Sequence, residues 1–157
     1  MKKLLCLSFV FLLITNLPYK TPIFNALSKI KPFATYSFYV QDNIEPNSSY
    51  YVIDNAGLGS VIRCGAQKSS LVKKKLINIV GESIRFEGSL ETMMSILSLY
   101  DAKTVKTEWI EDRIYNVYAK ARVFSNSIFI ENESINLQIC YNDGVITVGS
   151  PIILGDY

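Results

Sequence analysis

The sequence contains no histidine, and this absence excludes several kinds of active site. Histidine is the most frequent general base in enzymes and the most frequent metal ligand in proteins. Neither a Ser-His-Asp triad nor a Cys-His pair can be assembled within this chain. With only 3 cysteines, the chain also has too few thiolates for a four-cysteine zinc site. We therefore predict a protein that is not an enzyme, with no catalytic residues, no metal site and no cofactor.

A large excess of charge of either sign is also missing. The chain carries 16 Lys and Arg residues against 14 Asp and Glu residues, and its net charge is +2. Lys2 and Lys3 account for that excess, so the chain that follows them is neutral. A neutral domain has no long-range attraction for phosphate backbones. Nucleic acid is therefore not an expected partner.

What is present is the composition of a folded domain. The apolar fraction is 49% and the charged fraction is 19%, and both values are typical of globular proteins. A chain of 157 residues is long enough to bury one core without metals or disulfides. Ile, Lys and Asn are abundant while Ala and Arg are scarce, a bias that indicates an AT-rich genome and hence a low-GC bacterium.

The first 17 residues have the features of a signal peptide. Two lysines precede the apolar run Leu4–Ile14. As a helix, this run would extend only about 16 Å, roughly half of the hydrocarbon thickness of a bilayer. This length favours a signal peptide over a spanning helix. We predict that residues 1–17 are a signal peptide, with a short membrane anchor as the alternative, and that the rest of the protein lies outside the cytoplasm, secreted or tethered.

Residues 18–35 are predicted to be a linker that contains a short basic amphipathic segment. Thr21 is a candidate N-cap and Pro22 suits the first turn of a helix over residues 21–31. Apolar residues at helical spacing are surrounded by Lys20, Lys29 and Lys31. The segment either caps the domain or rests on anionic lipid. We favour the cap, because so short a helix buries little area.

Residues 36–157 are predicted to form a single α+β domain. Apolar spacing predicts helices from Ser69 to Val80 and from Ser89 to Tyr100. Strand patterns and turn residues predict a strand at 36–40, a hairpin over 50–64, a strand near 84–87 and a β-rich meander from Lys103 to Val148. The expected fold is an antiparallel or mixed sheet of about 6–8 strands with two helices packed on one face. Ile152–Leu154 is expected to add a last short strand, or else to dock on the sheet edge of a partner.

Two features of the domain carry candidate site residues. Cys64 and Cys140 form a disulfide if strand pairing brings them together, which an oxidising compartment would permit. The alternative is two unpaired, partly buried thiols, and a reactive cysteine is disfavoured because no histidine could activate it. The lysine run 73–75 is interpreted as a solvated helix face, because adjacent helical positions fan apart.

These observations leave three functions open. We predict a non-enzymatic interaction or binding module of the bacterial envelope, with an unidentified envelope protein as partner and possible membrane contact through the N-terminal segment. An open sheet edge or an exposed apolar patch would favour it. A carboxylate-dependent cell-wall hydrolase is the first alternative, because a pair of carboxylates can hydrolyse glycosides across a cleft, and acids cluster at Glu108, Glu111 and Asp112 and at Glu131 and Glu133. A small-ligand or lipid carrier is the second, and it requires a substantial apolar cavity between sheet and helices.

Overall fold

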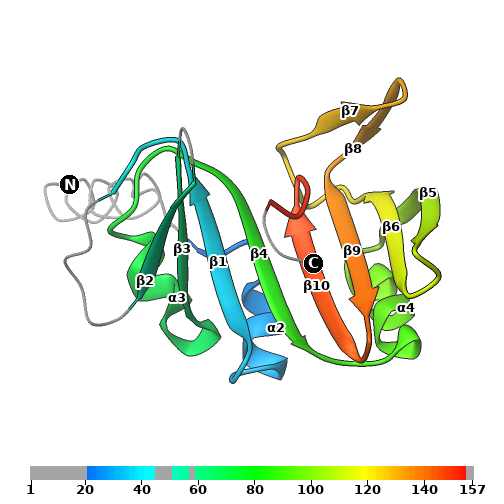
Figure 1. Ribbon diagram of the computed structural model, residues 1–157, viewed down its shortest axis with the longest axis horizontal. Helices are drawn as coiled ribbons and strands as arrows, with labels where there is room; N and C mark the ends of the chain where they lie inside the picture. Colours follow the sequence, from blue (N-terminus) through cyan, green and yellow to red (C-terminus); the bar gives the residue numbers. More distant parts are fainter. Residues whose placement is uncertain (1–20, 45–50, 57–58, 155–157) are drawn as a thin grey trace, which may run out of the picture.

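The computed structural model describes residues 21–44, 51–56 and 59–154. The predicted leader at residues 1–17 lies outside the described residues. The described chain forms a mostly-sheet domain with an eight-stranded antiparallel sheet, a small two-stranded sheet and few helices (Figure 1). The prediction of a sheet-rich domain that also contains helices is therefore confirmed, and the large sheet is antiparallel rather than mixed.

The large sheet combines strands from both halves of the chain. Its order is β2-β3-β1-β4-β10-β9-β6-β5, and the two-stranded sheet pairs β7 with β8. The strands are β1 Thr35–Val40, β2 Val52–Ala56, β3 Gly59–Gly65, β4 Ile79–Glu87, β5 Lys103–Ile110, β6 Ile114–Lys120, β7 Ile128–Ile130, β8 Glu133–Ile135, β9 Leu137–Asn142 and β10 Val145–Ser150. The hairpins predicted at 50–64 and at Asn142-Asp143-Gly144 are both present as β2–β3 and β9–β10.

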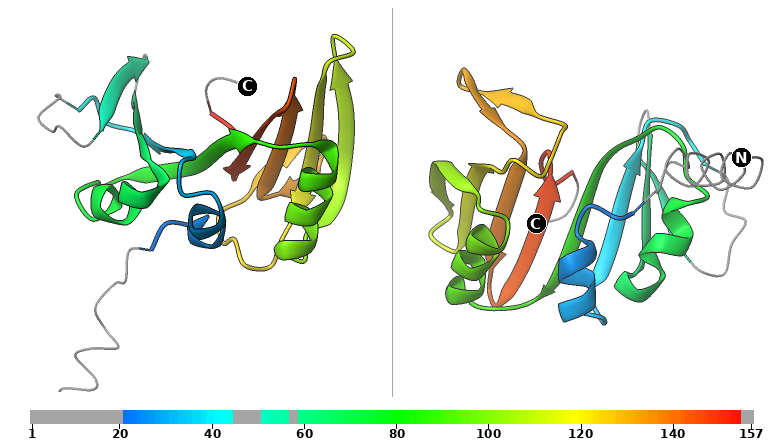
Figure 2. Two further views of the ribbon diagram at one scale, coloured as in Figure 1. Left: turned by 90° about the horizontal axis from the view of Figure 1, so that it is seen from below. Right: turned by 180° about the vertical axis from the view of Figure 1, so that it is seen from behind.

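Short helical segments precede the first strand or lie between later strands. They are α2 Asn25–Ile30, the 3-10 turn η1 Ala66–Lys68, α3 Ser69–Lys73 and α4 Leu90–Leu99. The helix predicted after Ser89 is confirmed, and the Ser89 side chain accepts a hydrogen bond from the Thr92 amide in a capping box. Figure 2 shows α2, α3 and α4 on one side of the large sheet.

The helix predicted from Ser69 to Val80 is wrong beyond Lys73. Asn78 has a positive φ of 54°, which a continuous right-handed helix does not allow. Ile79 begins β4 and pairs with Val40 of β1. Pairing with a neighbouring strand therefore overrides the helical spacing of the apolar residues. The N-terminal helix also begins later than predicted, because it starts at Asn25 with no side-chain cap, and Thr21 is not its N-cap.

The core lies between the sheet and the helices. Along one row of paired strands, Tyr36, Ile84, Val148, Ile139 and Val117 succeed one another and all belong to the main apolar cluster. Phe24, just before α2, and Leu27, within it, belong to the same cluster. The segment from Thr21 to Ala34 therefore shares the core of the sheet.

The C-terminal segment crosses the other face of the sheet. Ile153 is 4% exposed, and its backbone N–H donates to the side-chain oxygen of Gln138, 3.0 Å away. Gln138 lies between the core residues Leu137 and Ile139 on β9 and so points away from the core. The predicted packing of Ile152–Leu154 on the sheet is confirmed, but the predicted strand is not, since these residues have no strand structure.

Candidate functional site

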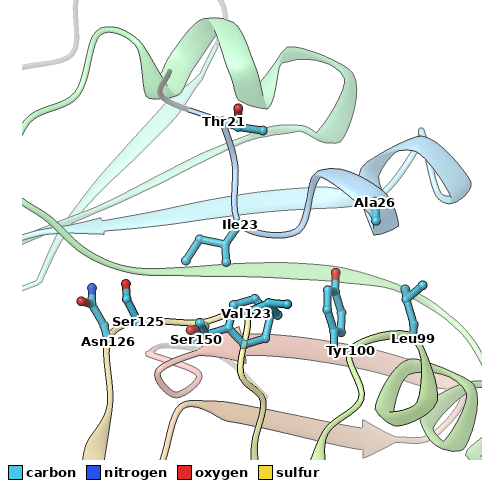
Figure 3. Close-up of a pocket in the computed structure, with 10 residues that line it drawn as sticks. Thr21, Ile23, Ala26, Leu99, Tyr100, Val123, Ser125, Asn126 and Ser150 are labelled. Carbon is cyan, nitrogen blue, oxygen red and sulfur yellow. The ribbon is translucent and has the colours of Figure 1, made fainter. Parts of the chain in front are cut away.

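A hollow of about 480 Å³ lies on the helical side of the sheet (Figure 3). Its walls come from four separate parts of the chain: the segment before and within α2, the end of α4, the loop after β6 and the end of β10. The lining residues are Thr21, Ile23, Ala26, Leu99, Tyr100, Val123, Phe124, Ser125, Asn126 and Ser150. A volume of this size is within the range of small-molecule pockets.

The segment 21–24 is fixed over the sheet by a buried carboxylate. Glu82 on β4 is 1% exposed, and its Oε2 accepts from the Ile23 backbone N–H, 2.9 Å away, and from the Tyr36 hydroxyl. Lys73, at the end of α3, forms an ion pair with the other carboxylate oxygen and donates to the Thr21 carbonyl, 2.9 Å away. Both oxygens of the buried carboxylate are thus partnered, as burial of a charge requires.

The Tyr36 hydroxyl stays protonated in this network. Burial is the largest cause that raises its pKa well above the ordinary value, and the neighbouring charge of Glu82 raises the pKa further. The hydroxyl therefore acts as a donor to Glu82 and as an acceptor for the Phe24 N–H, 3.2 Å away. The network joins the N-terminal segment to β1, β4 and α3.

An aromatic cluster forms the floor of the hollow. The ring of Phe24 lies edge-on to Tyr100 and to Phe124, with centroids 6.0 Å and 5.6 Å apart. Tyr100 and Phe124 are 5.1 Å apart. Such tilted contacts stabilise aromatic pairs beyond the area that they bury. The side chains of Tyr100 and Phe124 are therefore held in defined positions.

The loop after β6 is held by a buried amide. Asn136 is 3% exposed, and its side-chain nitrogen donates to the carbonyls of Ala121 and Phe124, each at 2.8 Å. Its side-chain oxygen accepts from the Ala121 N–H, also at 2.8 Å. This amide replaces the strand pairing that ends at Lys120, and it positions Val123 to Asn126 at the wall of the hollow.

Two residues of the lining have buried hydroxyls, Tyr100, which is 8% exposed, and Ser150, which is 1% exposed. The Ser150 hydroxyl has no hydrogen-bond partner among the described residues. Burial raises the pKa of Tyr100 above its ordinary value, and the interaction of its hydroxyl with the Leu27 backbone N–H offsets this only in part. Tyr100 therefore stays protonated and able to donate. Figure 3 shows its hydroxyl pointing towards the segment that carries Ile23 and Ala26.

The predicted disulfide residues lie on different strands of the large sheet. Cys64 is on β3 and Cys140 is on β9, with β1, β4 and β10 between them. Four strand spacings amount to about 19 Å, whereas a disulfide needs Cα atoms within about 7 Å. Both thiols are buried and unpaired, and burial raises the pKa of each to about 11. The structure therefore does not bring these two residues together.

The predicted acidic residues are distributed over two hairpins. Glu108 accepts from the Tyr118 hydroxyl at 2.6 Å, and Glu131 forms an ion pair with Lys106 at 2.7 Å. Glu131 and Glu133 border a smaller hollow of about 210 Å³, while Glu111 and Asp112 occupy the exposed turn between β5 and β6. Within the described ranges, no group of three or more Cys, Asp or Glu side chains could hold a metal ion.

One edge of the large sheet is open. Strand β5 ends the strand order and pairs only with β6 among the described strands. Trp109 on β5 is 54% exposed and stacks on Tyr115 with centroids 4.7 Å apart. The register shifts between Thr104 and Lys106, so the ladder is irregular there and regular from Thr107 to Ile110. The regular half of the edge thus carries the large aromatic residue.

Sequence reasoning missed the residues that define the hollow. Ile23, Tyr100 and Ser150 come from distant parts of the chain, and each has an ordinary sequence context. Lys73 was grouped with its neighbours as solvated, but it makes the buried ion pair with Glu82, and Lys74 and Lys75 are exposed. Glu82 alternates in phase with the buried Ile84 and Phe86 on β4, and an acidic residue on the apolar side of a strand was the available signal.

Comparisons with known proteins assign this chain to no family. No protein-family model, curated protein or solved structure matches it. In the part of the chain that the structure describes, no helix combines the length and the apolar character needed to cross a membrane.

Proposed function

We propose that this protein is a non-enzymatic binding module of the bacterial cell envelope, exported or membrane-tethered through residues 1–17. Strand β5 is its contact edge, and the occupant is an extended segment of an envelope protein that adds a strand to the sheet. The apolar leader supports the envelope address. The absence of histidine supports a function in binding rather than catalysis.

The open edge of β5 is the observation that carries the proposal. An edge strand presents unpaired backbone N–H and C=O groups that can accept a further strand. In β5, the charge of Lys103 and the register shift near Thr104 disfavour pairing with a further strand along one half of the edge. The half from Thr107 to Ile110 has regular pairing and carries the exposed Trp109. Tryptophan is enriched among the residues that dominate binding energy at interfaces, so this half is the expected contact.

Site-specific photo-crosslinking in the native host tests the proposal. A photoreactive amino acid replaces Thr107, exposed on β5, in one strain and Leu71 in another, so that Trp109 is kept in both. Leu71 is a matched control because it is 45% exposed on α3, which contacts β3 towards the opposite end of the strand order from β5. We expect one crosslinked product of defined mass from position 107 and not from position 71. The same products from both positions, or none from position 107, would contradict β5 as the contact edge.

A second variant separates binding from folding. Trp109→Ala removes the exposed ring but no buried contact in the core cluster, since Trp109 lies outside it. We expect the circular dichroism spectrum to stay unchanged while the crosslink from a photoreactive group at Thr107 is lost. Retention of that crosslink in the Trp109→Ala variant would show that the ring does not anchor the partner.

A further inference from the structure

We infer that residues 29–33, which comprise the end of α2 and the turn before β1, are a contact site for a lipid surface with anionic headgroups. We call these residues the basic turn. Phe33 and Ile30 enter the apolar layer beneath the headgroups, and Lys29 and Lys31 bind the headgroups themselves. This inference goes beyond the contact edge on β5, because no residue of the basic turn belongs to that strand.

The basic turn exposes two large apolar side chains. Phe33 is 93% exposed and Ile30 is 62% exposed. Earlier apolar residues of the same segment are used differently, because Phe24 and Leu27 belong to the core cluster. The segment therefore completes the core with one set of apolar residues and leaves a second set in water. Transfer of that second set from water to an apolar phase is favourable.

Backbone hydrogen bonds hold the basic turn in this position. The Lys31 N–H donates to the Leu27 carbonyl at 2.7 Å, and the Ala34 N–H donates to the Lys31 carbonyl at 3.1 Å. The Ala34 carbonyl in turn accepts from the Ala66 N–H at 2.8 Å, which ties the turn to η1. The ring of Phe33 is thus presented to solvent by an ordered backbone, so that little conformational freedom is lost when it binds.

Basic side chains surround the exposed apolar residues. Lys29 is exposed and Lys31 is half-buried. A hollow of about 580 Å³ beside Phe33 is lined by Lys31, by Arg85 and by one acid, Glu87. Three cations against one acid give these surroundings a net positive charge. Apolar side chains among lysines suit an anionic lipid surface, because the lysines are attracted to the headgroups while the apolar side chains leave water.

The length of the preceding chain favours a lipid surface over an acidic protein as the occupant. The Thr21 carbonyl accepts from Lys73 at the end of α3, 2.9 Å away, so Thr21 lies on the helical side of the sheet. Three residues separate Thr21 from Leu17, the end of the predicted leader, and this stretch spans at most about 14 Å. A domain tethered through residues 1–17 therefore keeps its helical side, which carries α2, near the bilayer (Figure 2). This step rests on the tether in the proposed function.

Photo-crosslinking of the full chain in the native host identifies what the basic turn contacts. A photoreactive phenylalanine analogue replaces Phe33 in one strain and Phe129 in another. Phe129 is a matched control, because it is 75% exposed on β7 and the β7–β8 hairpin lies at the opposite end of the molecule from α2 (Figures 1 and 2). We expect an adduct with the mass of one phospholipid from position 33 and none from position 129. A protein adduct or no adduct from position 33, or equal lipid adducts from both positions, would overturn the inference.

Vesicles of defined composition test the contribution of the lysines. The protein that carries the analogue at position 33 is added to phosphatidylcholine vesicles with or without phosphatidylglycerol. We expect at least about fivefold more lipid adduct with phosphatidylglycerol, and we expect Lys29→Gln combined with Lys31→Gln to remove that difference. Lys103→Gln combined with Lys120→Gln removes the same charge from exposed lysines on β5 and β6 and should leave the difference intact. Equal yields on both kinds of vesicle, or equal losses in the two double variants, would overturn the inference.

A last pair of variants tests the aromatic ring itself. With the photoreactive analogue at Ile30, Phe33→Ser is expected to lower the yield of lipid adduct about tenfold or more, whereas Phe129→Ser should leave it unchanged. Circular dichroism should be unaltered in both variants, because both rings are exposed. An unchanged yield in Phe33→Ser would overturn the role of the ring. Crosslinking at position 107 reports on the contact edge and host fractionation reports on the tether, so each proposal fails by its own measurement.

Discussion

Breaking the buried ion pair between Lys73 and Glu82 tests how the N-terminal segment is attached. Lys73→Met keeps the apolar stem of the side chain but leaves the carboxylate of Glu82, which is 1% exposed, without its counter-charge. Removing one partner of a buried pair costs about 3–5 kcal/mol. Glu82 would still accept from the Ile23 N–H and the Tyr36 hydroxyl. We therefore expect a loss near 3 kcal/mol, the lower end of that range.

The second variant of the pair makes the prediction specific. Glu82→Gln keeps an acceptor oxygen for Ile23 and Tyr36 but removes the charge. Combined with Lys73→Met, it removes the unpaired buried charge, so the double variant is expected to be more stable than Lys73→Met alone. Urea unfolding followed by circular dichroism measures the free energies of unfolding. A loss below about 1 kcal/mol in Lys73→Met, or strict additivity in the double variant, would refute the assignment of a buried charged pair.

Three further predictions follow from burial and close packing. Tyr36 and Tyr100 have raised pKa values in the folded state. The stability they contribute is therefore present below the unfolded pKa of about 10 and is lost as pH rises from there through the folded pKa. Urea unfolding should show stability that declines above a pH of about 10, with a shallower decline in Tyr100→Phe. Cys64 and Cys140 have pKa values of about 11, so both thiols should react slowly with a chromogenic disulfide reagent near neutral pH until the protein unfolds. Reductant should leave the thermal midpoint of unfolding unchanged, and a midpoint lowered by reductant would indicate a disulfide. A Cβ atom at Gly149 would lie 2.7 Å from the Ile153 nitrogen, while one at Gly65 would meet nothing within 4 Å. Gly149→Ala should therefore lower the free energy of unfolding by about 1–3 kcal/mol or more, and Gly65→Ala should change it little. Equal stability of the two variants in urea unfolding would contradict the close approach of the C-terminal segment to β10.

Local signals in the sequence predicted the elements whose structure is determined locally. Ser89 followed by a helical apolar stripe predicted α4, because a cap and its helix are separated by only a few residues. Asn142-Asp143-Gly144 predicted the turn between β9 and β10, where Asp143 and Gly144 both have positive φ. These elements required no knowledge of distant residues.

The elements that depend on distant partners were not predicted. Ile79 and Val80 continue a helical spacing in the sequence, but β1 and β10 provide strand partners for β4. The hollow could not be predicted for the same reason, because Ile23, Tyr100 and Ser150 meet only through the order of strands in the sheet. The separation of Cys64 from Cys140 likewise follows from that order and from no local pattern.

Fractionation of the native host, with intact-mass analysis of the recovered protein, tests the central claim of an envelope binding module most directly. The account predicts either a shortened chain in the medium or wall fraction, after cleavage near residue 17, or a full-length chain in the membrane fraction. The mass distinguishes a cleaved signal peptide from a retained anchor. A full-length, soluble chain in the cytoplasm would contradict the envelope address and the proposed partner with it.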